Sequence, residues 1–334
     1  MAQVIDTLGR VNAKLLAWIK RVQAEQDAVT LDYSKRIVDF YVNKTLAAVN
    51  DKVKIVTLVI ENNPEITPAA IKKTAEYRQL ILAVGEELRE FTEYATVQVD
   101  LASKQSIRAA VLDIGVLATI INLDKAKIVT PDAIEILRNY LAKDGDLYKR
   151  IGLWAGNSTD AVIKAIIDGV GLGRNPRKIA ADISRALGLS LQDALRTTRT
   201  VQLWAYREAT RANFIANSDF IKGWIWHAAL DERTCLSCLN MHGTIHPLSE
   251  PLNDHYNGRC AMLPYPAGEG VIQTTGKEYF DGLSEAEQQG RMGKARYKAY
   301  KDGLFDFSKL TRELDDPVYG AMRSETPLKD LLNE

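Results

Sequence analysis

Two patterns meet in residues 223–238 of this 334-residue chain, which have the sequence GWIWHAALDERTCLSC. In the first half, Trp224 and Trp226 stand two positions apart, a spacing that places both side chains on one face of a β-strand. The second half holds Cys235 and Cys238 in a Cys-x2-Cys spacing, which is typical of a knuckle turn that directs two thiolates at one metal ion. The sequence therefore predicts a strand that leads directly into a metal-binding turn.

Further residues of the ligand type follow this turn. His255 and Cys260 come shortly after it, and all 3 cysteines and all 4 histidines of the chain lie between His227 and Cys260. Three thiolates and one imidazole form a ligand set that suits tetrahedral Zn²⁺. The predicted ligands of this structural zinc site are Cys235, Cys238, His255 and Cys260. His242 and His246 could each replace one of these four.

Other interpretations of the same residues stay open. The thiols could be small buried hydrophobic groups that bind no metal. Cys235, His242 and Asp231 could form the thiol, base and orienting carboxylate of a nucleophilic site. Asp254-His255 is similar to the start of a metal-dependent ββα nuclease motif, but that motif normally needs another ligand on a following helix, and no histidine comes after His255.

The composition excludes several classes of protein. Hydrophobic residues make up 46% of the chain, which is enough for a packed core. The 43 basic residues balance 43 acidic ones, so the chain lacks the net positive charge expected of a general nucleic-acid binder. The longest apolar stretch, around Ile114–Leu123, is too short for a membrane span. No signal peptide precedes it, and an odd number of cysteines argues against a disulfide framework, so we expect a protein of the cytosol.

The first 150 residues are predicted to be helical and contain no catalytic motif. Thr67-Pro68 and Thr130-Pro131 each combine an N-cap side chain with a proline at the first helical position. Apolar residues recur at helical spacing in Ile71–Val99 and in Ile107–Leu123. A further helix is expected after Pro131, ending at Asp144-Gly145.

The second half is predicted to contain helices and a small β element. Glycine and asparagine at 153–159 predict a loop and a domain boundary there. Asn175-Pro176 predicts the start of a helix to about Leu187, and Ser190 the start of another to about Ala216. The glycines at 169–173 lack the ending of a phosphate-binding P-loop. Residues 261–266 are predicted to form a strand beside the tryptophan strand, so that zinc would clip the two strand ends.

Basic residues accumulate on the predicted helices between residues 174 and 211. A broad face of the second helix carries Arg196, Arg199, Arg207 and Arg211. Such a face could contact phosphates or dock on an acidic protein surface.

The knuckle and its surroundings resemble the phage Mu protein F-like minor head proteins, also called the head morphogenesis family of tailed phages. Besides residues 223–238, the matching positions are His242-Gly243, Pro247-Leu248 and His255-x-Asn257-x-Arg259-Cys260. Arg199-Thr200 also agrees, although Val201 stands where the family tends to show glutamate. One departure concerns the metal site: members commonly show Asn-Cys-Arg-Cys, and this chain has Gly258 in place of the first cysteine. The resemblance extends over about residues 160–310.

The resemblance implies a minor capsid protein of a tailed phage or prophage. Such a protein associates with the portal and acts in procapsid assembly, DNA packaging or ejection. The implied partners are the portal protein, the major capsid protein and packaged DNA, the last through the four arginines above, without a membrane. The expected location is the virion, in the capsid interior or at the portal vertex, after assembly in the host cytoplasm. We expect no enzymatic activity; the alternative function is a zinc-dependent nuclease or DNA-binding module.

These inferences define an α+β fold that is predominantly α-helical, with a helical N-terminal half and a C-terminal half of helices plus a small zinc-clipped β element. The predicted domains are a helical attachment arm at 1–150, a Mu F-like head morphogenesis domain at 151–310 with its zinc knuckle at 224–265, and a tail at 311–334.

Overall fold

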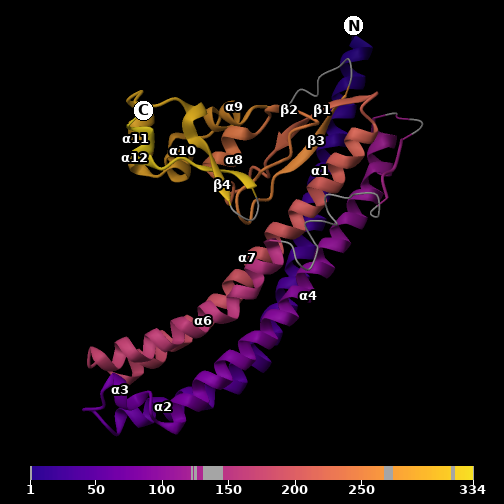
Figure 1. Cartoon of the computed structure of the whole chain (residues 1–334). Helices are drawn as coiled ribbons and strands as arrows, with labels where there is room; N and C mark the ends of the chain where they lie inside the picture. The colour runs from indigo at the N-terminus through magenta and orange to yellow at the C-terminus, as the bar shows by residue number, and fades with distance from the viewer. Residues whose placement is uncertain are drawn as a thin grey trace. The chain divides into compact units, whose positions relative to one another are not determined.

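The computed structural model describes residues 2–121, 123, 126–130, 146–266, 274–316 and 320–333. These residues are mostly helical, with two small antiparallel sheets, so the predicted fold class is confirmed (Figure 1). The helices up to residue 216 are α1 (Ala2–Phe40), the π-helix η1 (Tyr41–Leu46), α2 (Ala47–Glu61), α3 (Pro68–Ile71), α4 (Ala75–Ile120), α6 (Asp146–Gly171) and α7 (Pro176–Ala216). None of the helices in this described part of the chain has the length and apolarity needed to cross a membrane.

Two helix starts lie where the sequence predicts them. The Thr67 side chain accepts a hydrogen bond from the Ala70 amide at the start of α3. The Asn175 side chain accepts one from the Arg177 amide at the start of α7. These contacts satisfy amides that the first helical turn leaves without a backbone partner. The helix expected after Pro131 lies outside the described residues.

Two predicted helix breaks are wrong. Residues 153–159 lie inside α6, so no loop or boundary occurs there. The two helices predicted on either side of residue 188 are the single helix α7. The two predicted helical stretches Ile71–Val99 and Ile107–Leu123 lie mostly within the single helix α4. Buried apolar residues at helical spacing carry α6 through its glycines; they are Leu147, Ile151, Trp154, Val162 and Ile166. Tertiary packing therefore outweighs the local helix-breaking residues.

Ser190 explains why α7 continues where a helix start is predicted. Its side chain is fully buried inside the helix instead of capping an end. The hydroxyl donates to the carbonyl of Trp154 at 3.0 Å and lies 2.7 Å from the hydroxyl of Ser158, both on α6. A serine that finds partners on a neighbouring helix no longer competes with its own backbone for hydrogen bonds.

The chain forms two compact units, and neither is continuous in sequence. Unit 1 comprises Met1–Ala28, Ser103–Arg138 and Gln202–Glu334, and unit 2 comprises Val29–Ala102 and Asn139–Val201. Helices α1, α4 and α7 are each divided between the two units, with one part of the helix in each. This division differs from the predicted domains 1–150, 151–310 and 311–334, because long helices carry the chain out of unit 1 and back into it.

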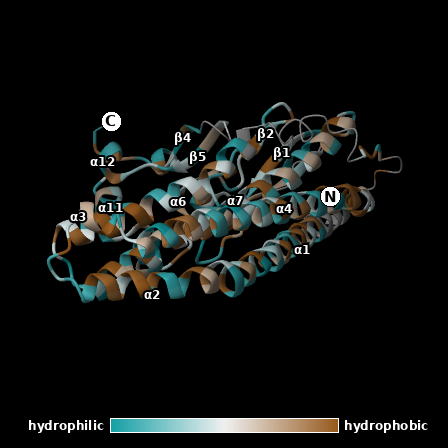
Figure 2. Cartoon of the chain, turned by 60° about the horizontal axis from the view of Figure 1, so that its bottom comes forward, coloured by the Kyte–Doolittle hydropathy of each residue, from teal (hydrophilic) through white to brown (hydrophobic). Residues whose placement is uncertain are grey.

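Unit 2 is a helical bundle without a sheet among its described residues. Phe40 stacks on Tyr94 with ring centroids 4.1 Å apart, and Tyr41 packs edge-on against Phe91. Figure 2 shows hydrophobic and hydrophilic residues alternating along α2 and α4, the pattern of amphipathic helices. Gly169 of α6 lies where a Cβ would meet Ile179 of α7 at 2.6 Å, so this glycine permits close helix packing and not a phosphate loop.

Unit 1 contains the three-stranded antiparallel sheet β2-β1-β3, formed by β1 (Ile221–His227), β2 (Ile245–Pro247) and β3 (Ala261–Pro266). Both predicted strands, β1 and β3, are confirmed, with Trp226 opposite Met262 in the register. The two indole rings of β1 lie 5.9 Å apart, as the spacing of Trp224 and Trp226 predicts. His246 of β2 stacks on Trp224 at 4.3 Å.

Short elements complete unit 1 around the sheet. They are α8 (Leu236–Met241), α9 (Gly276–Asp281), α10 (Glu285–Met292), α11 (Lys294–Lys301), η3 (Phe307–Leu310), the hairpin β4 (Thr311–Asp316) and β5 (Gly320–Glu325), and α12 (Leu328–Leu331). Their common core includes Leu239 of α8, Phe280 of α9 and Leu310 of η3. Through Leu236 and Leu239, α8 joins this core immediately beside the cysteine knuckle.

We expect Trp226→Ala to lower the free energy of unfolding by about 3–5 kcal/mol, because the side chain is large and the truncation leaves a cavity in a packed core. The Trp226 side chain is only 1% exposed. Urea denaturation measures the loss, with Leu304→Ala as control, since Leu304 is 59% exposed. A loss no larger than that of the control would show that the tryptophan strand does not belong to the stable core.

Candidate metal centre

The Cys-x2-Cys knuckle is formed by the start of α8. Cys235 is the N-cap residue with extended backbone, and its sulfur accepts a hydrogen bond from the Cys238 amide at 3.3 Å. Cys238 follows in the first helical turn and is buried. The turn thus brings the two sulfurs to the same side of the helix start, as the spacing predicts.

His255 and Cys260 belong to the loop that precedes β3. The His255 Nε2 atom lies 3.1 Å from the sulfur of Cys235 and 3.1 Å from the sulfur of Cys238. Its other ring nitrogen, Nδ1, lies 2.7 Å from the carbonyl oxygen of Tyr256. If Nδ1 donates its proton to that carbonyl, Nε2 keeps a lone pair directed at the sulfurs, which is the usual arrangement of a metal-binding histidine.

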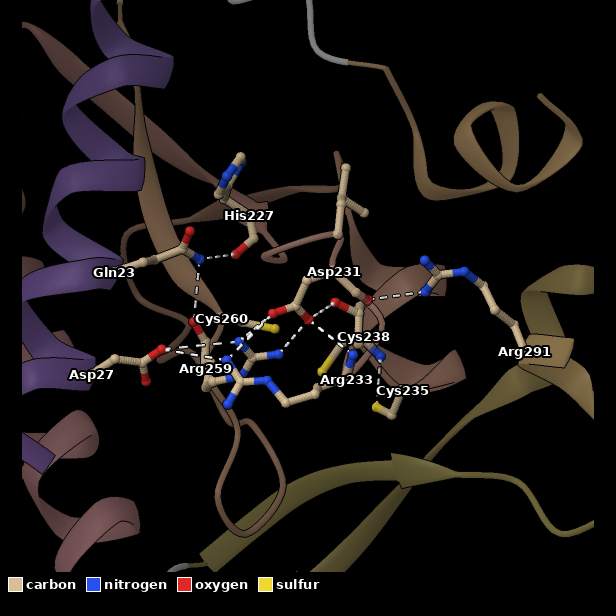
Figure 3. Close-up of polar contacts among 12 residues, drawn as sticks. Gln23, Asp27, His227, Asp231, Arg233, Cys235, Cys238, Arg259, Cys260 and Arg291 are labelled. Atoms are coloured by element: carbon tan, nitrogen blue, oxygen red, sulfur yellow. Dashed lines mark hydrogen bonds and ion pairs between the residues drawn. The ribbon is translucent and has the colours of Figure 1, made fainter. Parts of the chain in front are cut away.

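The four predicted ligands and Asp254 form two overlapping sets that could each hold a metal ion. One set is Cys235, Cys238 and His255, and the other is Cys238, Asp254 and Cys260; within each set the ligand atoms lie within 4.8 Å of one another. Cys238 is common to both. A cavity of about 30 Å³ borders all four predicted ligands, which is room for a single ion or water molecule. Figure 3 shows the three cysteines converging beside Arg259.

Asp254 is the one member of these two sets that is not among the predicted ligands. Its side chain is 1% exposed and pairs with the guanidinium of Arg207 on α7, 3.1 Å away. Arg207 also donates to the carbonyl oxygens of Cys260 and Gly258, each at 2.9 Å. In the sequence, Asp254 directly precedes a predicted ligand, and the pair Asp254-His255 is similar to the start of a nuclease motif; neither signal assigns the carboxylate to the zinc site.

Gly258 is required by the position of Asp254. A Cβ atom on residue 258 would overlap the Asp254 carboxylate. Any larger residue at 258 would therefore displace the buried carboxylate, and with it the ion pair to Arg207. Where the Asn-Cys-Arg-Cys pattern has its first cysteine, this chain thus has a glycine, and the Asp254 carboxylate fills the space that a cysteine side chain would need.

The cluster perturbs the pKa values of its own members. A hydrogen bond from the Cys238 thiol and the nearby His255 imidazole lower the pKa of Cys235 to about 5. Hydrogen bonds to Cys235 and Cys260, together with burial, raise the pKa of Cys238 well above its usual value. Burial lowers the pKa of His255, but the Cys235 sulfur and the Asp254 carboxylate outweigh it and raise this pKa to about 10. Protons and a metal ion therefore compete for the same ligand atoms.

An outer layer of ion pairs surrounds the knuckle (Figure 3). Arg259 donates to both carboxylate oxygens of Asp231, at 2.7 and 2.5 Å, and these bonds hold the pKa of Asp231 well below its usual range. Arg291 of α10 donates to the Asp231 carbonyl at 3.1 Å. Gln23 of α1 donates to the carbonyl of Arg259 at 3.2 Å. The loops that carry the ligands are thus fixed by two other elements of unit 1.

The nucleophilic alternative does not fit these contacts. The Asp231 carboxylate is occupied by Arg259, and His242 uses Nδ1 to accept a hydrogen bond from the Ala228 amide at 3.0 Å. Burial lowers the pKa of His242 to about 4, so it is neutral at pH 7. His246 lies between Glu250 and Thr244. Neither His242 nor His246 belongs to the metal sets found among the described residues.

The predicted arginine face of α7 is not formed as expected. Arg207 is buried and pairs with Asp254, while Arg211 is largely buried and pairs with Glu208 at 2.6 Å. Both side chains therefore form ion pairs inside unit 1 and are not part of an exposed basic face, because a buried guanidinium group needs an anion beside it. Contact of Arg196 and Arg199 with DNA stays a prediction.

Comparison with known proteins supports the resemblance drawn from the motif. Residues 160–263 match the family described as Phage Mu protein F like protein. The matched segment contains β1, α8 and every member of the metal cluster. It supports a protein related to phage head morphogenesis. No curated protein and no solved structure matches the chain.

Proposed function

We propose that this chain is a minor capsid protein of a tailed phage or prophage that associates with the portal and acts in procapsid assembly, DNA packaging or ejection. The observation that carries the proposal is the family match over residues 160–263. Its proposed location is the virion, in the capsid interior or at the portal vertex. The proposed partners are the portal protein and the major capsid protein.

We further propose that the metal is Zn²⁺ and that its role is structural. Thiolate and imidazole donors favour zinc over magnesium or calcium, which prefer all-oxygen sites. A zinc ion at this cluster would tie α8 to the loop before β3, so that the sheet and the C-terminal core are held together. We propose no enzymatic activity, since the thiols serve the metal and Asp231 and His242 have other partners.

The decisive experiment is assembly in the presence of portal protein. A tagged full-length chain is co-expressed with the portal and major capsid proteins of the same phage or prophage, and procapsids are purified and analysed by mass spectrometry and cross-linking. We expect the chain in the procapsid fraction, cross-linked to portal protein, and its absence from particles assembled without portal. A folded, zinc-loaded chain that is excluded from complete procapsids would contradict the proposal.

The alternative function, a DNA-binding module, can be tested on the same purified protein. Binding of duplex DNA through Arg196 and Arg199 would weaken log-linearly with salt and would be reduced by Arg196→Glu with Arg199→Glu. We expect the double variant to enter procapsids as the wild type does. Arg207 and Arg211 are unsuitable for this test because their substitution would disturb the interior of unit 1.

A further inference from the structure

We infer that the Asp254 carboxylate is itself a metal ligand, so that the site binds its ion through oxygen as well as sulfur and nitrogen. This inference rests on the zinc site proposed above. It concerns the donor set of that site, because the Cys-x2-Cys, His and Cys pattern does not include Asp254. A tetrahedral ion has four ligands, so Asp254 would take the place of Cys235 or Cys260, each of which belongs to only one of the two candidate sets.

The position of one carboxylate oxygen carries the inference. Asp254 Oδ1 lies 3.4 Å from the Cys238 sulfur and 3.5 Å from His255 Nε2, and these two atoms lie 3.1 Å from each other. Zinc–ligand bonds of about 2.0–2.3 Å at tetrahedral angles separate neighbouring ligand atoms by about 3.3–3.8 Å. The two distances from Oδ1 fall within this range, and the distance between the Cys238 sulfur and His255 Nε2 is slightly shorter, so the three atoms form a triangular face close to the size of one in a tetrahedral zinc site.

The two oxygens of Asp254 have different surroundings. Oδ2 accepts hydrogen bonds from Arg207 at 3.1 Å and from the Cys260 amide at 3.2 Å. Oδ1 accepts from the His255 amide at 2.9 Å and otherwise faces the sulfur and the imidazole. Both oxygens are therefore held by hydrogen bonds, but only Oδ1 also faces the sulfur and the imidazole, as expected of a monodentate ligand with supporting outer contacts.

The alternative role for Asp254 is purely positional. Its contacts with the His255 and Cys260 amides could simply orient the two ligands of the loop. The two roles differ in one respect that can be measured. A ligand changes the electronic spectrum of the bound metal, whereas a positioning residue changes affinity but leaves the donor atoms the same.

The experiment uses the full-length chain loaded with Co²⁺, whose visible spectrum depends on its ligands. The bound Co²⁺ is then displaced by Zn²⁺ to measure zinc affinity. We expect Asp254→Asn to weaken zinc binding by about 10–100-fold or more and to change the ligand-field bands of cobalt. The thiolate-to-cobalt charge-transfer intensity per bound ion should stay the same, because the cysteines remain. The matched control Asp281→Asn, which removes an exposed carboxylate paired with Lys277, should change neither property.

Two further measurements keep the inference falsifiable if Asp254→Asn does not fold. Arg207→Lys keeps the positive charge but removes the hydrogen bonds of the guanidinium to Oδ2 and to the carbonyl oxygens of Gly258 and Cys260. It leaves every donor atom in place, so it should weaken binding but preserve the cobalt ligand-field bands. X-ray absorption of the zinc-loaded wild type should require two nitrogen or oxygen neighbours besides sulfur. An identical cobalt spectrum for Asp254→Asn, or a single nitrogen or oxygen neighbour in the wild type, would overturn the role of Asp254 while leaving the zinc site intact. A wild type that binds neither metal would overturn both.

Discussion

Replacing Cys238 with serine is expected to abolish metal binding and to lower the free energy of unfolding by on the order of 5 kcal/mol, the scale on which the loss of a structural metal acts. Cys238 is chosen because it belongs to both metal sets, whereas Cys235 and Cys260 each belong to one. Serine keeps the size of the side chain and its place in the first turn of α8. The loss therefore reports the metal and not a packing defect.

The measurement is denaturation of wild type and variant, each with zinc and with a strong chelator. Because the metal binds only the folded chain, zinc should stabilise the wild type in proportion to its free concentration. We expect the difference between the two proteins to be large in zinc and to shrink toward the small cost of a buried hydroxyl in chelator. A difference that stays the same in chelator would mean that the cluster is an ordinary apolar packing of thiols.

The structure brings the predicted cysteines and His255 together, and the binding of a metal by them stays a prediction. The main signals for this cluster are local. The Cys-x2-Cys spacing and the spacing of Trp224 and Trp226 each involve only a few residues. The local backbone conformation that each spacing predicts therefore depends little on the rest of the fold. Asp254 was missed because its position depends on Arg207, 47 residues away along the chain, and on the absence of a side chain at Gly258. Contacts of that range leave no periodic trace in a single sequence.

Helix boundaries were missed for a related reason. Ser190 and the glycines of α6 do interrupt isolated helices, and propensity alone predicts a break at each. In the folded chain Ser190 forms hydrogen bonds with Trp154 and Ser158, and the missing side chain of Gly169 leaves room for Ile179. These residues therefore join two helices side by side instead of ending either. The same continuity explains why compact units and predicted domains differ.

A fragment comprising residues 159–334 is expected not to fold into the stable, zinc-binding state of the full chain, although it contains the whole metal cluster. The cut falls inside α6, and unit 1 draws two of its three segments from residues before the cut. The domain boundary predicted at 153–159 would instead make this fragment an independent body.

The missing segments supply buried partners to α7. Gln202 is fully buried and donates to Gln26 of α1 at 2.6 Å and to Ser106 of α4 at 2.7 Å. The Tyr206 hydroxyl donates to Asp113 of α4 at 2.7 Å. Each buried polar group left without its partner costs about 1–3 kcal/mol, and the lost apolar contacts of α1 and α4 add to this. The sum equals or exceeds the net stability of a typical domain, about 5–15 kcal/mol.

The test compares the fragment with the full chain by urea denaturation and by zinc content after purification. We expect a broad or absent unfolding transition and weak metal retention for the fragment alone. Addition of a second fragment, residues 1–158, should restore a cooperative transition, because it returns the partners of Gln202 and Tyr206. A fragment that unfolds cooperatively and holds zinc without this help would instead establish residues 159–334 as an independent body. In that case the contacts of α7 with Gln26, Ser106 and Asp113 would be dispensable for the metal centre, and the first 150 residues could act as a separable attachment arm.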